Sequence, residues 1–436
     1  MKIKHSAAAL LAVSMGLGSA YGLDLSTEQK VKQIIADYSP VVWFHGEEQY
    51  FTHNVDAYLN SINMLGGVVS SANSYDNFKQ EHVYYWSADH INRYGINSSQ
   101  ASLKNYISSR HNVPRGDVQT WFKIADQSIK AGDVGATKTY VVANEDPLAR
   151  TLTLEYNYFY PYNGPGRFEV CMSGNDCSNI QSTTVGRHQG DWESVNLVID
   201  TQTDEVKKVY LSAHGDLKES KDDILFWNRH PYVYSAKYSH AFYPQGGRVD
   251  YERVWSKDYW LGTASVDLFD VTGSASYLWS PYPNGYQVIK SNMDVFADTL
   301  IPEWVTYSER WGFNEKLKHS VSITIFGGSV YTYDYKEVGR GPNKRIDNTP
   351  KGATLFKHPN YQGYAITLDT GSYTIAQLSA QGIPNDDVSS IHVPSGYKVD
   401  IYQHDNFGGW VRTYYNDIPG LGSGDNQISS VRVSKL

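Results

Sequence analysis

The residues best suited to chemistry lie together in one short segment, Gly186-Arg-His-Gln-Gly-Asp-Trp-Glu193. The run that follows it predicts a strand. Alternate side chains of a strand share a face, so we expect Asp191 and Glu193 to project to one side and Trp192 to face the core. His188 should reach the two carboxylates from the turn before the strand. Two carboxylates and an imidazole that converge make either a divalent-cation site or an acid–base site.

Like charges this close repel each other unless a cation or a proton lies between them, so we expect a cation. Two further histidines are candidates for a general acid or base. His214 ends the predicted strand that precedes it, and His240 lies in a tyrosine-rich segment. A histidine at the end of a strand can equally be a hydrogen-bonded structural residue.

The C-terminal region contains a two-part repeat. An aromatic residue followed by six residues and a glycine occurs at 356–363 and again at 402–409. A second signature, an Asn/Asp pair followed by Ser-Ser, occurs at 385–390 and at 425–430. Calcium prefers six to eight oxygen ligands, and each second signature offers such oxygens from residues close in sequence: Asn385, Asp386 and Ser389 in the first, and Asp425, Asn426 and Ser429 in the second. The alternative is that these residues only form turns at strand ends.

Residues 353–436 resemble one complete βγ-crystallin domain, made of two Greek-key motifs. The resemblance implies that the glycine of each aromatic hairpin has a positive φ. It also implies that Ser389 and Ser429 each give a hydroxyl ligand to a calcium ion. Backbone carbonyls near Asp387 and Gln427 would then complete the two shells.

The elements before this repeat are mainly strands, with helices added. Helices are predicted at 26–35, 99–110 and 294–311, the last interrupted by Pro302. Strands are predicted at 151–160, 194–199 and 206–211. We therefore expect a mainly β fold with added helices: a β-sandwich large domain and a C-terminal double Greek-key domain. The predicted division is a signal peptide at 1–22, a large domain at 23–335, a linker at 336–352 and a C-terminal domain at 353–436.

The N-terminal residues predict the compartment. A basic start, a short apolar run and a small-residue exit at Ala20-Tyr21-Gly22 are typical of a secretory signal peptide. We expect a secreted protein without a transmembrane segment, in which Cys171 and Cys177 are bonded to each other; the alternative is a pair of free thiols. The net charge of -8 argues against nucleic acid as a partner.

Several separated segments of the large domain are similar to the family of vacuolar protein sorting-associated protein sixty-two. These segments are Tyr38–His45, Tyr158–Asn163, His188–Glu193, Pro231–Ala241 and Arg310–Gly312. Their order and spacing cover roughly residues 30 to 315 and predict membership of that family.

The segment Gly186–Glu193 also resembles the central heptapeptide of necrosis- and ethylene-inducing-peptide-like toxins. That resemblance implies a secreted β-sandwich that holds a cation with His, Asp and Glu, binds sphingolipid headgroups and lyses cells. The sequence departs from the toxins at Gln189-Gly190, where they place one histidine. This departure bears on both the cation geometry and the lipid recognition.

Three functions remain open from the sequence. The first is a secreted calcium-binding effector that engages a cell-surface glycan or lipid headgroup through a cation at His188, Asp191 and Glu193, with cytolysis as one outcome. The second is a metal-dependent hydrolase of a polysaccharide or phosphoester, with His214 or His240 as general base or acid. The third is a structural matrix protein. Calcium is the expected cofactor, with a second divalent cation in the large domain.

Overall fold

Strands dominate the computed structural model of the chain, which describes residues 22–69, 80–172, 176–181, 186–259, 262–273, 277–279, 285–307, 309–312, 324–325, 328–329, 352–393 and 397–436. The predicted fold class, mainly β with added helices, is confirmed. Residues 1–21 of the predicted signal peptide and residues 336–351 of the predicted linker lie outside the described residues. No described helix has the length and apolar character needed to cross a bilayer.

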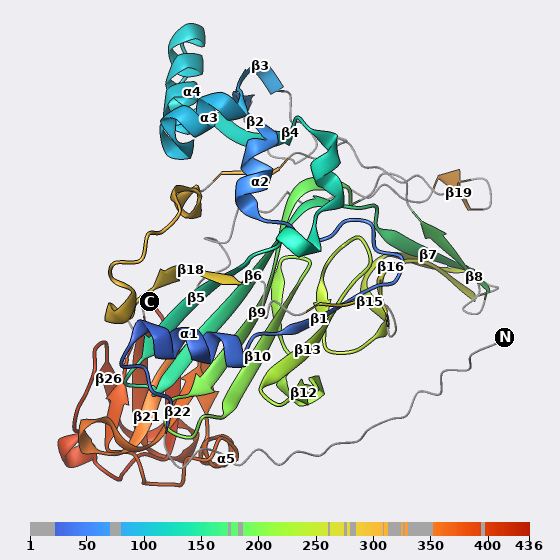
Figure 1. Cartoon of the computed structure of the whole chain (residues 1–436). Coiled ribbons are helices and arrows are strands. Elements are labelled where there is room, and N and C mark those ends of the chain that lie inside the picture. Colours follow the sequence, from blue (N-terminus) through green and yellow to red (C-terminus); the bar gives the residue numbers. More distant parts are fainter. Residues whose placement is uncertain are drawn as a thin grey trace, which may run out of the picture.

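Two long antiparallel strands, β6 (Thr151–Asn163) and β9 (His188–Asp200), form the centre of the large domain. They belong to a six-stranded sheet of order β11-β10-β9-β6-β5-β18 (Figure 1). The other strands of this sheet are β5 (Thr139–Asp146), β10 (Val206–Ala213), β11 (Asp216–Glu219) and β18 (Tyr286–Ser291).

A second sheet faces part of the first. Its strands are β1 (Val41–Phe44), β12 (Phe226–Trp227), β13 (His230–Ser235), β14 (Phe242–Tyr243) and β17 (Tyr277–Trp279). Side chains from both sheets and from helix α1 (Glu28–Asp37) share one apolar core, as a β-sandwich requires. The N-cap residue of α1 is Thr27, whose hydroxyl accepts a hydrogen bond from the Lys30 N–H.

A smaller layer covers the opposite face of the central sheet. It consists of a three-stranded sheet of order β3-β2-β4 with three helices (Figure 1). Its elements are α2 (Val55–Asn60), β2 (Ile62–Val69), β3 (Gln80–Trp86), α3 (Ala88–Tyr94), α4 (Ile96–His111) and β4 (Val118–Ile124). Leu103 and Ile107 form the buried face of α4, whereas Tyr106 is 39% exposed. The helix predicted at 99–110 lies within α4.

A third group of strands extends from the sandwich as an arm (Figure 1). It is the four-stranded sheet of β15 (Gly247–Tyr259), β16 (Gly262–Thr272), β7 (Arg167–Met172) and β8 (Asp176–Gln181). Cys171 and Cys177 are cross-strand neighbours in β7 and β8 and form a disulfide, which confirms the predicted pairing.

The helix predicted at 294–311 is wrong. The chain there forms only two 3-10 turns, η5 (Asp294–Phe296) and η6 (Glu303–Thr306). Pro302 disfavours α conformation in the residue before it and cannot donate a backbone hydrogen bond. The other short elements of the large domain are η1 (Arg115–Asp117), η2 (Gln127–Ala131), η3 (Val134–Ala136), η4 (Lys221–Asp223), β19 (Thr324–Ile325) and β20 (Gly328–Ser329).

The C-terminal domain begins with β21 at Gly352 and contains two sheets around its own apolar core. The first sheet has β22 (Gln362–Asp369), β21 (Gly352–His358) and β24 (Ser390–His392). The second has β23 (Gly371–Tyr373), β27 (Ser430–Lys435), β25 (Tyr397–His404) and β26 (Gly408–Tyr414). Helix α5 (Ile375–Ala380) and the turns η8 (Pro359–Tyr361), η9 (Asp405–Phe407) and η10 (Gly422–Gly424) connect them.

The two sequence repeats exchange a strand in this domain. β23 belongs to the first repeat but pairs with β27 of the second, and Ile418 of the second repeat forms an isolated bridge with Ile391 of β24 in the first sheet. Gly363 and Gly409 have φ values of 84° and 74°, as the crystallin-like hairpins require of glycine.

Candidate functional site

The start of β9 carries the predicted cluster. Tyr160 is the cross-strand partner of Asp191, and Tyr158 is that of Glu193. Cross-strand partners project to the same face, so both carboxylates lie on one side of the sheet. Trp192 lies on the other side, buried among aromatic rings of the second core. His188 differs from the prediction, because it belongs to β9 itself rather than to the turn before it.

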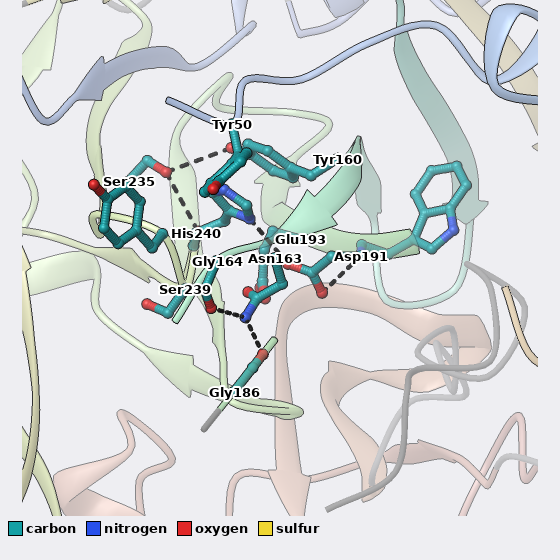
Figure 2. A network of polar contacts seen from close by, with 12 residues as sticks. Tyr50, Tyr160, Asn163, Gly164, Gly186, Asp191, Glu193, Ser235, Ser239 and His240 are labelled. Carbon is teal, nitrogen blue, oxygen red and sulfur yellow. Dashed lines mark hydrogen bonds and ion pairs between the residues drawn. The ribbon is translucent and has the colours of Figure 1, made fainter. Parts of the chain in front are cut away.

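Asp191 pairs with a histidine that is distant in sequence (Figure 2). The Nδ1 atom of His240 lies 3.2 Å from one carboxylate oxygen of Asp191. The backbone N–H of Trp192 donates to the other oxygen at 3.0 Å. The His240 ring stacks on Tyr160 with 3.9 Å between centroids. The structure therefore joins two sequence candidates, Asp191 and His240, in one buried pair.

A second carboxylate lies on the far side of the His240 ring. Oε1 of Glu48 is 3.9 Å from Nε2 of His240. The Glu48 carboxylate accepts the backbone N–H groups of Gln49, Tyr50 and Tyr238 at 2.7–2.8 Å. Sequence reasoning missed Glu48, although it follows the family-like segment ending at His45 by only three positions.

The two histidines near Asp191 have opposite pKa shifts. Burial favours neutral imidazole and lowers the pKa of His188 despite the charge of Asp191. Burial acts on His240 too, but the hydrogen bond that His240 donates to Asp191 and the charges of Glu48, Asp191 and Glu193 outweigh it and raise the pKa of His240. The buried acidic group therefore favours the protonated form of His240, and burial favours the neutral form of His188.

Glu193 is held by the neighbouring strand. The Ser212 hydroxyl on β10 donates to the Glu193 carboxylate and accepts the Ser194 N–H at 2.7 Å. Two positions further along the chain, His214 follows the end of β10. Ser212, which binds Glu193, therefore lies only two positions before His214, the other histidine candidate.

His214 forms its own pair with an aspartate. Its Nε2 atom lies 2.7 Å from the carboxylate of Asp270 on β16. The hydroxyls of Ser239 and Tyr243 also donate to Asp270, each at 2.7 Å. Burial lowers the pKa of His214, but Asp270 more than compensates, so the net shift is upward. Unlike fully buried His240, the His214 side chain is 25% exposed.

The ligand atoms of the predicted cation cluster do not all lie within 4.8 Å of one another. Within the described part of the chain, the only three His, Cys, Asp or Glu side chains whose ligand atoms all lie within 4.8 Å of one another are Glu169, Cys171 and Cys177, and the cysteines are bonded to each other. The three ligands predicted at His188, Asp191 and Glu193 form no such group. The reason is visible in their partners: Asp191 is paired with His240, and Glu193 accepts the Ser212 hydroxyl.

The second signatures of the C-terminal repeat lie side by side. The Asp386 N–H donates to the Ile428 carbonyl, and the Asn426 N–H donates to the Val388 carbonyl, both at 3.2 Å. Asp386 and Asn426 have positive φ values of 55° and 53°. The two loops are thus related as the sequence repeat suggests, and each closes against the other.

Oxygen atoms of these loops suit a hard cation. Ser389 and Ser429 are buried, and one carboxylate oxygen of Asp425 is buried without a hydrogen-bond partner. A buried, unsatisfied carboxylate oxygen is costly unless a cation approaches it. Of the other candidates, Asn385 donates to Asp386, Asp387 lies 3.3 Å from the Lys357 ammonium, and Gln427 is exposed.

Comparison with known proteins separates the two parts of the chain. The family model described as vacuolar protein sorting-associated protein 62 matches residues 97–325, more than half of the chain. Development-specific protein S of Myxococcus xanthus is 41% identical over 80 residues, which are 18% of this chain and 46% of that protein. The chain spans about half the length of the curated relatives it matches.

Solved structures of single domains are also similar. A βγ-crystallin domain from Clostridium beijerinckii is 40% identical, and the match covers 19% of this chain and 97% of that domain with a TM-score of 0.19. One from Flavobacterium johnsoniae is 37% identical over 19% of this chain and 93% of that domain, also with a TM-score of 0.19.

Proposed function

This chain belongs to the vacuolar protein sorting-associated protein 62 family and carries a domain of the βγ-crystallin type, and on that basis we propose that it is a secreted, calcium-binding effector that acts at a cell surface. The C-terminal domain binds two calcium ions in its paired loops. The large domain engages the target, a glycan or a lipid headgroup.

The observation that carries the calcium proposal is the buried carboxylate oxygen of Asp425 beside two reciprocal loops. Carboxylate, hydroxyl and carbonyl oxygens are the ligands that calcium prefers. Ser389 and Ser429 would supply one hydroxyl to each ion, and carbonyls near Asp387 and Gln427 would complete the shells. The bound ions neutralise the acidic loops and fix their backbone.

Calorimetric titration of the full chain tests this proposal. We expect about two calcium ions per chain, and an upward shift of the melting temperature of the C-terminal domain, because a ligand of the folded state stabilises it. The double variant Ser389→Arg with Ser429→Arg should lose both, since each guanidinium takes the position of an ion.

A matched control is Ser379→Arg, which adds the same charge at an exposed position of α5. The control should bind calcium as the natural chain does. Unchanged titration of the double variant would overturn the assignment of the ions to these loops.

The role at a cell surface is supported by the predicted secretion signal, the disulfide in the arm and the toxin-like segment at Gly186–Glu193. Asp191 is central to that segment. We expect Asp191→Asn to abolish lysis of target cells or vesicles while the fold is retained. Elemental analysis of the same variant decides whether a cation is lost with the activity or whether the ion pair with His240 alone is needed.

One observation favours a second candidate, a hydrolase. His214 is partly exposed and paired with buried Asp270, an arrangement in which the carboxylate orients an imidazole for proton transfer. A screen of polysaccharides and phosphoesters would reveal turnover, and His214→Ala should abolish it. Lysis that persists in His214→Ala, without turnover of any soluble substrate, would favour the first proposal.

A further inference from the structure

Five aromatic side chains form a continuous row where α3, α4 and the edge strand β3 meet. Consecutive rings have centroid separations of 4.6 Å (Tyr94 to His90), 4.8 Å (His90 to Trp86), 6.0 Å (Trp86 to Tyr106) and 5.1 Å (Tyr106 to Tyr84). We name these five rings the aromatic ladder. Neither the predicted cation chemistry nor the calcium loops make use of it.

The ladder is open to solvent on one side, while Tyr84 and Trp86 also pack against the second apolar core. The buried side of α4 is formed by Ile96, Leu103 and Ile107, whereas Tyr94 and Tyr106 are 56% and 39% exposed. Clustered aromatic rings that remain accessible to solvent are typical of binding surfaces. Because the rings already hold one another in place, a ligand that packs on them loses little affinity to the ordering of side chains.

A guanidinium lies at the end of the ladder formed by Tyr106 and Tyr84, and it has no acidic partner among the described residues. The Cζ atom of Arg110 is 5.9 Å from the ring centroids of both Tyr84 and Tyr106. Its Nε atom donates to the Tyr84 hydroxyl at 3.0 Å. Among the described residues, no carboxylate lies within 4.0 Å of Arg110, whereas Arg229 and Arg248 are each paired with one.

The two features together identify the chemistry of a ligand. A guanidinium matches a carboxylate in size and geometry and binds it with two parallel hydrogen bonds. A sugar ring presents an apolar C–H face that packs on an aromatic ring, and hydroxyls that remain in water. The ladder offers aromatic rings beside the Arg110 guanidinium, whereas membrane-binding faces combine large apolar residues with several Lys or Arg.

We propose that the aromatic ladder and Arg110 bind an oligosaccharide that carries a carboxylate. The Arg110 guanidinium takes the carboxylate, and the sugar rings pack along the ladder. This inference rests on the proposed role at a cell surface and names its target as an acidic glycan. The ladder lies at the end of the molecule opposite the C-terminal domain (Figure 1), so glycan and calcium can bind at the same time.

The full chain tests the proposal on an array of carboxylate-bearing glycans and their neutral counterparts, followed by titration with the best ligand. We expect binding only to the acidic members. Arg110→Gln should weaken it at least tenfold, and Tyr94→Ala with Tyr106→Ala should do the same. Arg115→Gln is the matched control: it removes an exposed charge just beyond α4 and should bind as the natural chain does.

Three results would overturn the inference: no binding to any acidic glycan by folded protein, equal binding by Arg110→Gln, or ladder-dependent binding to vesicles of phosphatidylserine instead. All substitutions are at exposed positions, and a thermal melt confirms that each variant folds. Calcium titration of the same samples keeps the two proposals apart. If the natural chain binds calcium but no acidic glycan, only the ladder proposal is refuted. If it binds an acidic glycan but no calcium, only the calcium assignment is refuted.

Discussion

Substitution of Asp425 by alanine should change stability in opposite directions with and without calcium. One carboxylate oxygen of Asp425 is buried and has no hydrogen-bond partner. Without calcium, that oxygen has lost its hydrogen bonds to water and forms none within the protein. This costs about 1–3 kcal/mol for a buried acceptor. Removing the carboxylate should therefore stabilise the calcium-free C-terminal domain by about 1 kcal/mol.

With calcium the sign reverses. At a calcium concentration of 100 times the dissociation constant, one site stabilises the folded domain by about 2.7 kcal/mol. If Asp425→Ala weakens that site a hundredfold, the remaining contribution is about 0.4 kcal/mol, so the variant loses about 2.3 kcal/mol of calcium stabilisation. After the gain of about 1 kcal/mol in the calcium-free domain, the variant is less stable than the natural chain in calcium by about 1.3 kcal/mol. The control is Asn385→Ala, the equivalent position of the first loop. Its amide is exposed, so the calcium-free domain should be nearly unaffected.

Hydrogen exchange measures this in the full chain. The slowest amides of β21 and β27 report the free energy of unfolding of the C-terminal domain itself, independently of the large domain. In EDTA, these amides should therefore exchange more slowly in Asp425→Ala than in the natural chain. In calcium, they should exchange faster in Asp425→Ala. Destabilisation of the same size under both conditions would refute the reasoning, because it would mean that Asp425 only stabilises the loop.

The remaining predictions concern the large domain. Trp192→Ala should destabilise it by about 3–5 kcal/mol, since a buried ring surrounded by other aromatic rings leaves a cavity; a denaturant melt checks this, and a loss below 1 kcal/mol would contradict the packing. His214 has a raised pKa in the folded chain, so its ion pair with Asp270 contributes stability that is complete below the ordinary histidine value of 6.5 and is lost as the pH rises through the folded-state pKa. Asp270→Asn should abolish this pH dependence above pH 6.5, and a pH-dependent loss of the same size in that variant would exclude the pair as its source.

The repeats made the C-terminal domain easy to predict. Both hairpin glycines and both Asn/Asp-x-x-Ser loops occur at matching positions, so two copies of one pattern support each other. The strand exchange between β23 and β27 left no such signal, because it depends on contacts between residues about 60 positions apart.

The large domain was predicted less well, and its candidate site shows why. Alternation within β9 placed Asp191, Trp192 and Glu193 on the correct faces. Alternation could not predict the partners of these side chains, because the partners belong to other elements that the sandwich brings together. They are His240, Ser212 and Glu48. A carboxylate pair in one strand predicts that something neutralises it; whether that is a metal ion or a distant imidazole is decided by the tertiary structure.

The reciprocal backbone hydrogen bonds between the two C-terminal loops bear on how sharply the domain responds to calcium. The backbone of each loop is hydrogen-bonded to the other, so an ion that orders the first loop also removes conformational freedom from the second. The second ion then binds to a loop that is already arranged, which is positive cooperativity through shared order. We therefore expect the two calcium sites to become occupied over a narrower range of calcium concentration than two independent sites would. Both loops should lose their conformational freedom together.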